Sequence, residues 1–86
     1  MIDLTPEQCR AARAFLGWKQ GELASFTSLS AVTIRTFEAG GTMRDSNQKL
    51  IRLVFRNAGV EFDEDERGRQ RITFDKAMSE RFIAER

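Results

Sequence analysis

The sequence predicts a mainly α-helical domain that ends in a possible β-hairpin and a short C-terminal helix. Three observations lead to this fold class: N-cap residues precede stretches with helical spacing of apolar residues, glycines follow these stretches, and apolar and polar residues alternate only after Gly59. We divide the chain into a four-helix segment, residues 1–62, and a C-terminal extension, residues 63–86. A chain of 86 residues is near the lower size for a self-sufficient core, so dimerisation would help its stability.

The first expected helix begins after Thr5 and ends before Gly17. Thr5 is a good N-cap, Pro6 suits the first helical position, and Gln8 completes a capping box. Cys9 lies at a core-facing position of this helix. Because the chain has no histidine to activate a thiol, we interpret Cys9 as a small buried apolar residue.

Residues 20–40 predict two short helices separated by a tight turn. Gln20 begins the first of them, and Ser30 is a good N-cap for the second. Ile34 and Phe37 stand three positions apart, so they share the side that faces the core. The opposite side carries four short side chains and one arginine, namely Ala31, Val32, Thr33, Arg35 and Thr36. Such a side can approach another surface closely.

A fourth helix is expected to begin with Asp45 or Ser46 as its cap and to end at Gly59. Its apolar arc is wider than one core contact requires, which leaves residues for a partner subunit. After Gly59, two alternating runs at residues 60–62 and 71–74 predict a β-hairpin that needs a surface to lie on. Asp75 then caps a last helix.

We expect dimer contacts in the fourth helix, the hairpin and the last helix. The candidates are Leu53, Phe55, Phe62, Ile72, Phe74, Met78 and Phe82. The acidic run at residues 63–66 is interpreted as a solvated turn and not as a cation site.

Charge is distributed unevenly along the chain. Residues 1–59 contain eight Lys and Arg against five Asp and Glu, whereas residues 60–86 contain six against eight. The basic half is the half with the two short helices, which indicates an anionic partner there.

Several function classes receive no support from the sequence. There is no His, no Tyr, no glycine-rich phosphate loop and no EF-hand spacing, so we expect neither an enzyme nor a bound metal or cofactor. The single Cys excludes an internal disulfide and suits a reducing cytosol. No apolar run is long enough for a membrane span, and the N-terminus lacks the features of a secretion signal. We therefore expect a cytoplasmic protein without membrane contact.

Two stretches resemble a known family. L-G-W-K-Q-G-E-L-A, followed by L-S-A-V-T-I-R-T-F-E-A-G, is similar to the helix-turn-helix of the Cro and lambdoid-repressor family, also called the XRE family. The resemblance extends over residues 5–62 and implies a four-helix lambda-repressor-like domain that binds double-stranded DNA. In such proteins the second helix of the motif lies in the major groove.

Carried over residue by residue, the resemblance assigns roles. The base contacts would be Ala31, Val32, Arg35 and Thr36. The phosphate contacts would be Arg10, Lys19, Gln20, Thr33 and Arg44. Arg35 suits a bidentate bond to guanine, with a plain phosphate contact as the alternative, and the short side chains and the Thr36 methyl group suit thymine methyl groups. Arg13 and Glu38 would form a structural ion pair.

Three residues depart from the family pattern. Lys19 replaces the usual Ser or Thr cap, and Ser28 replaces the turn glycine, so either Ser28 has a positive φ or the turn differs. Phe26 replaces a polar surface residue and is expected to pack on Trp18 or on the C-terminal segment.

Two function classes stay open at this stage. The first is a homodimeric, sequence-specific transcription regulator, in the first instance a repressor, that binds a palindromic operator. The second is a protein-interaction module, such as an antitoxin or antiactivator, whose C-terminal segment captures another protein, with DNA binding secondary or lost. A folded C-terminal segment that buries a dimer interface would favour the first class, and a tail that is disordered until a partner arrives would favour the second. The sequence decides neither the operator nor the regulated genes, and it does not separate repression from activation.

Overall fold

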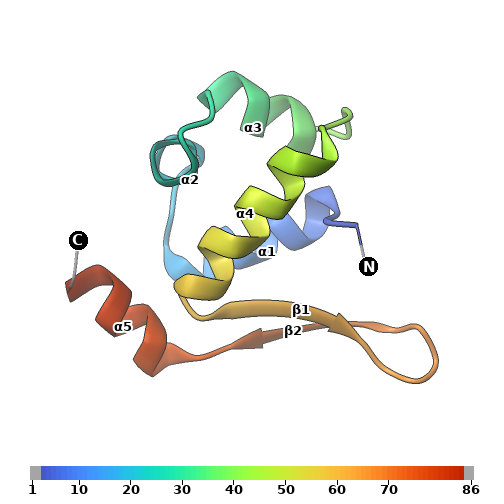
Figure 1. The fold of residues 1–86 in the computed structure, drawn as a ribbon, viewed down its shortest axis with the longest axis vertical. Coiled ribbons are helices and arrows are strands. Elements are labelled where there is room, and N and C mark those ends of the chain that lie inside the picture. Colours follow the sequence, from blue (N-terminus) through green and yellow to red (C-terminus); the bar gives the residue numbers. More distant parts are fainter. Residues whose placement is uncertain (1–2, 85–86) are drawn as a thin grey trace.

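A computed structural model describes residues 3–84, which form five helices and one β-hairpin (Figure 1). In chain order the elements are α1 (Pro6–Leu16), α2 (Gln20–Thr27), α3 (Ala31–Glu38), α4 (Asp45–Asn57), β1 (Val60–Glu64), β2 (Gln70–Phe74) and α5 (Lys76–Ala84). The predicted mainly helical class with a hairpin and a C-terminal helix is confirmed. The outermost residues of the two expected segments, 1–2 and 85–86, lie outside the described residues.

Side-chain caps fix the start of three helices as the sequence predicts. Thr5 Oγ1 accepts the backbone N–H of Gln8 at 3.1 Å, and Gln8 Oε1 accepts that of Thr5 at 3.0 Å, which is a complete capping box. Ser30 Oγ accepts the N–H of Thr33 at 3.0 Å at the start of α3. Asp75 caps α5 through a bond of 3.0 Å from the backbone three residues later. Each bond satisfies a donor that the helix itself leaves free.

The start of α4 differs from the prediction. The expected cap at Asp45 or Ser46 is wrong, because both residues are helical and Arg44 is the N-cap, without a side-chain bond. Gln48 lies three residues after Asp45, where its side chain could complete a capping box, but it instead accepts the N–H of Leu4 at 3.2 Å, 44 positions away. A long-range contact has therefore replaced a local one.

The turn between α2 and α3 has a non-glycine residue in the left-handed region. Ser28 has a φ of 58°, which costs about 1 kcal/mol for a residue with a Cβ atom. Phe26, in the preceding turn of α2, contacts both of its expected partners. Its ring centroid lies 4.6 Å from that of Trp18 and 5.3 Å from that of Phe82 in α5.

The hairpin lies across α1 and α4, and the loop at its tip extends past the helices (Figure 1). The strands are antiparallel, with Val60 opposite Phe74 and Phe62 opposite Ile72. Val60 and Phe62 are buried, and the Phe74 ring stacks on Phe15 of α1 at 5.3 Å. The helical body thus supplies the surface that a two-stranded sheet needs.

Two expected dimer contacts are corrected by this packing. Phe55 has 0% and Phe62 has 8% of its surface exposed, because the hairpin covers the side of α4 that the sequence left unassigned. Phe55 therefore belongs to the core of the protomer, whereas Leu53 on the same helix is 51% exposed.

The C-terminal extension is continuous with the helical body. The expected boundary between residues 62 and 63 falls inside β1, and the Phe82 ring of α5 lies 5.7 Å from Trp18. Gly59 makes the reversal from α4 into β1 possible, with a φ of 101° and a position where a Cβ atom would lie 2.4 Å from the Asp75 carbonyl oxygen. Among the described residues, no helix is both long and apolar enough to cross a membrane.

Candidate nucleic-acid interface

The outward side of α3 is exposed and carries the predicted base-contacting residues. Ala31, Val32, Arg35 and Thr36 are all exposed, and 58% of the Val32 surface is accessible. Ile34 lies on the opposite side of the same helix and is 0% exposed. The core therefore fixes which side of α3 faces outward, and that side combines short side chains with one guanidinium group.

The N-terminal end of α3 is well ordered by its own polar residues. Ser30 Oγ lies 2.8 Å from Thr33 Oγ1 in addition to accepting the Thr33 N–H. The Thr33 hydroxyl is engaged with the Ser30 hydroxyl at the cap. Thr33 is half-buried, so part of the residue stays accessible. The first turn of α3 is thus capped by hydrogen bonds between its own residues.

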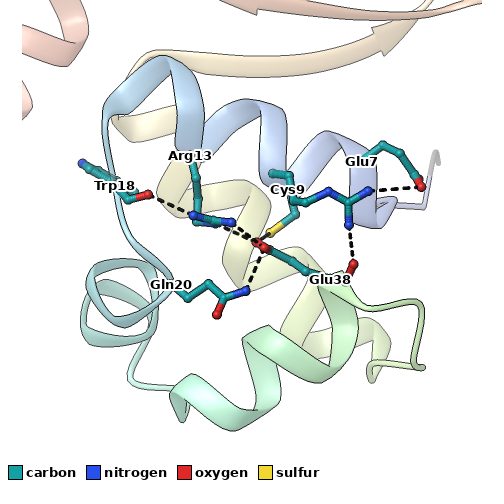
Figure 2. Close-up of polar contacts among 7 residues, drawn as sticks. Glu7, Cys9, Arg13, Trp18, Gln20 and Glu38 are labelled. Carbon is teal, nitrogen blue, oxygen red and sulfur yellow. Dashed lines mark hydrogen bonds and ion pairs between the residues drawn. The ribbon is translucent and has the colours of Figure 1, made fainter.

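The C-terminal end of α3 is anchored by a buried ion pair. The Arg13 guanidinium donates through Nε to Glu38 Oε2 at 2.7 Å and through Nη2 to Oε1 at 2.5 Å, which is a bidentate arrangement (Figure 2). The Glu38 side chain is only 3% exposed and that of Arg13 is 17% exposed. Arg13 Nη1 also donates to the Trp18 carbonyl at 3.1 Å. The predicted structural pair is confirmed, and it ties α1 to both α3 and the segment before α2.

Further donors from α1 and α2 converge on Glu38. Gln20 Nε2 donates to Oε1 at 3.1 Å, and Cys9 Sγ donates to Oε2 at 3.0 Å (Figure 2). Arg10 donates to the backbone carbonyl of Glu38. We refer to Cys9, Arg13, Gln20 and Glu38 as the Glu38 cluster.

The Glu38 cluster shifts the pKa of its members. Burial alone would raise the pKa of Glu38, but the hydrogen bonds from Arg13, Cys9 and Gln20 outweigh it and hold that pKa below its usual value. The hydrogen bond to Glu38 raises the pKa of Arg13. Burial raises the pKa of the Cys9 thiol, and the neighbouring carboxylate raises it further. Cys9 is therefore an inert buried residue, as its sequence context indicates.

Apart from Thr33, the predicted phosphate-contacting residues fall into two groups. Lys19 and Arg44 are exposed, and the backbone N–H of Lys19 is bound by Glu22 Oε1 at 3.0 Å, which compensates for the missing cap at α2. Arg10 and Gln20 already donate to Glu38, so part of their donor capacity is used inside the protein. These two residues orient α1 and α2 whether or not they also reach a phosphate.

Thr36 lies close to the loop that follows α3. A Cβ atom built on Gly41 would lie 2.8 Å from Thr36 Cγ2, and the Gly41 N–H donates to the Thr36 carbonyl at 2.9 Å. The Thr36 methyl group thus faces the loop that follows α3. Thr36 as a residue is exposed, and its contact with thymine stays a prediction.

The remaining dimer candidates are at least partly accessible. Leu53 is 51% exposed on α4. Half-buried residues of the hairpin and α5 make up the rest, namely Ile72, Phe74, Met78 and Phe82. Ile72, Phe74 and Phe82 also pack against the core.

Sequence reasoning missed the convergence on Glu38. Gln20 was assigned to a phosphate, and the bonds from Cys9 and Arg10 were not foreseen. These residues are separated from Glu38 by 18 to 29 positions, so no local pattern connects them.

Comparison with known proteins adds no assignment. No protein-family model matches the sequence, and no curated protein matches it. The functional argument therefore depends on the residues and their geometry.

Proposed function

We propose that this chain is a cytoplasmic, sequence-specific DNA-binding transcription regulator with a lambda-repressor-like helix-turn-helix. It binds a palindromic operator as a homodimer, in the first instance as a repressor. α2 and α3 are the two helices of the motif, and α3 lies in the major groove with four residues at base edges, namely Ala31, Val32, Arg35 and Thr36.

The observation that carries this proposal is the contrast between the two sides of α3. Its inner side is fixed by Ile34, Phe37 and the Glu38 cluster, while its outer side is free of large side chains except Arg35. A major groove admits a helix only when the approaching side is narrow, and one arginine can bond to both O6 and N7 of guanine. The exposed Lys19 and Arg44 add positive charge for the DNA backbone.

The state of the C-terminal segment favours this class over an antitoxin or antiactivator that captures a partner with a disordered tail. β1, β2 and α5 are folded within the protomer, and aromatic side chains bind them to α1 and α2. A tail that orders only on a partner would not pack the half-buried Phe82 against Trp18 of its own protomer.

The test is selection of binding sites from a randomised duplex pool by the purified protein. We expect a two-fold symmetric consensus, because a symmetric dimer contacts two equivalent half-sites. As a control, the variant Arg35→Ala is taken through the same selection, and its consensus should lose information at the guanine position of each half-site.

Failure to enrich any sequence would contradict the proposal. Retention of DNA without a consensus would leave only an electrostatic surface, and the search would then move to a protein partner of the C-terminal segment.

A further inference from the structure

A groove of about 400 Å³ runs between α4 and β1. Val60, Glu61 and Phe62 of β1 line it, although the side chain of Glu61 points to the opposite side of the strand from the other two. A groove can be lined by side chains from both faces of a strand only where it runs along the edge of that strand. The groove therefore follows the edge of β1 that β2 does not cover.

The opposite wall of the groove is basic. Lys49, Arg52 and Arg56 of α4 line it, together with the exposed Leu53. Their spacing of three and four residues places them on one side of the helix. The groove thus combines positive charge, one accessible leucine and an uncovered strand edge.

The register of the hairpin identifies which backbone groups point into this groove. The N–H of Asp75 donates to the Gly59 carbonyl at 2.7 Å, and that of Asp65 donates to the Arg69 carbonyl at 2.9 Å. Because hydrogen-bonded pairs alternate along an antiparallel ladder, Gly59, Glu61, Asp63 and Asp65 direct their backbone groups toward β2. Val60, Phe62 and Glu64 therefore direct theirs to the free edge.

The outward backbone groups of Val60, Phe62 and Glu64 in one copy can pair with those of the same three residues in a second copy. In an antiparallel arrangement with a two-fold axis at Phe62, that residue lies opposite its own copy, and Val60 lies opposite Glu64 of the partner subunit. Every residue in this register presents both an N–H and a C=O group to its opposite number. If the register between the two β1 strands shifted by one residue, backbone groups that point to the free edge in one copy would lie opposite residues whose backbone groups point to β2 in the other copy.

Charge is complementary in the same register. Glu64 lies on the same side of β1 as Val60 and Phe62 but beyond the helices, where it is exposed and has no ion-pair partner within residues 3–84. Opposite Val60, Glu64 of the partner subunit would reach the basic wall near Arg56. The two-fold axis repeats this contact, so that Glu64 of the first copy reaches the basic wall of the second.

We propose that two copies of this chain associate through the free edges of β1 into a four-stranded antiparallel sheet, with the two-fold axis at Phe62 and Glu64 of each copy in the basic groove of the other. The inference rests on the proposed homodimeric regulator and assigns its dimer interface. It also covers Leu53 and removes an exposed strand edge of the kind that otherwise promotes aggregation.

One contact in this interface is unfavourable. On the other face of the sheet, Glu61 lies opposite Asp63 of the partner subunit, and like charges in that position weaken strand pairing. Both carboxylates already have a cationic neighbour, because Arg56 lies 3.4 Å from Glu61 and Arg71 lies 2.8 Å from Asp63.

The interface is tested by proline and arginine substitutions on the two edges of the hairpin. Glu64→Pro removes an N–H from the β1 edge, and Gln70→Pro is the matched control, because Gln70 is paired with Glu64 and its N–H points away from β1. By sedimentation equilibrium, we expect Glu64→Pro to raise the dimer dissociation constant on the order of thirtyfold. Glu64→Arg should raise it roughly tenfold, whereas Gln70→Arg should leave it unchanged.

The arginine pair keeps the test decisive even where proline disturbs the hairpin. A wild-type protein that sediments as a monomer, or equal effects at positions 64 and 70, would overturn the interface. Binding to a duplex with one half-site is measured in parallel. A dimer that prefers the half-site but responds equally to substitutions at positions 64 and 70 contradicts the interface alone, while a dimer that responds only at position 64 but lacks sequence preference contradicts the proposed DNA recognition alone.

The register is tested by a cross-link. Residues in non-hydrogen-bonded pairs approach most closely, so the double variant Glu61→Cys, Asp63→Cys should form a covalent dimer on oxidation. The control Arg71→Cys, Thr73→Cys on the edge of β2 should stay monomeric. The native Cys9 does not compete, because it is fully buried. Equal cross-linking of both variants would overturn the proposed register.

Discussion

The two sides of α3 differ in their contacts with the rest of the protein. The inner side ends in Glu38, whose carboxylate is bound by Arg13, Cys9 and Gln20. On the outer side, Val32 and Arg35 are exposed. The inner side determines where the helix lies, and the outer side determines what it can bind. An eight-residue helix is too short to be stable alone, so its position depends on the inner contacts.

The largest effect is expected where the inner side is broken. Glu38→Ala leaves the Arg13 guanidinium partly buried without its partner and should lower the free energy of unfolding by about 3–5 kcal/mol. The measurement is urea denaturation followed by circular dichroism. The control is Glu7→Ala, which removes an exposed pair with Arg10 at 3.5 Å and should change stability by less than about 0.5 kcal/mol. Equal effects of the two variants would refute the structural role of Glu38.

Acid should weaken the same contacts. The pKa of Glu38 is lower in the folded protein than in the unfolded chain, where it is about 4.3. The stabilisation from this carboxylate is therefore complete above that pH and is lost as the pH falls through the folded-state pKa. The stability difference between the wild type and Glu38→Gln should shrink over this acidic range. A difference that stays constant would show that Glu38 does not titrate with folding.

On the outer side, Arg35→Ala should affect recognition and not stability. We expect it to reduce the preference for the selected operator over scrambled DNA by about 1–3 kcal/mol, since a bidentate contact to guanine is lost. Unfolding should change by less than about 0.5 kcal/mol, because Arg35 is exposed. Arg81→Ala in α5 is the control for loss of charge. If Arg35→Ala weakens binding to every sequence equally, Arg35 contacts phosphate instead.

Gln20 connects the two sides and should give the smallest effect on each. Gln20→Ala removes one hydrogen bond to Glu38 and is expected to cost about 1 kcal/mol of stability. If its amide also reaches the DNA backbone, affinity for operator and scrambled DNA will fall together. Fluorescence anisotropy with both duplexes measures this. Unchanged stability would mean that the contact to Glu38 contributes nothing in solution.

The difference between local and long-range contacts explains which features could be predicted from the sequence. The caps at Thr5, Ser30 and Asp75 are local bonds over three residues, so the sequence was sufficient for them. The role of Gln48 was missed because its partner Leu4 is distant in the chain.

Burial was harder to predict than secondary structure. Phe55 was assigned to a dimer contact because the sequence shows the apolar arc of α4 but not the hairpin that covers it. In the candidate site, the outward residues of α3 follow from helical spacing and were placed correctly on the exposed side. The orientation of the Thr36 methyl group depends on its contact with Gly41, which only the folded loop reveals.

The central claim is that the outer side of α3 recognises bases while the inner side positions the helix. The most direct measurement is the affinity of the wild-type protein for its selected site and for scrambled DNA at two salt concentrations. We predict a specificity ratio of about a thousand or more that changes less with salt than either affinity, because base contacts release no counterions. A ratio near one, with both affinities falling steeply as salt rises, would contradict the claim.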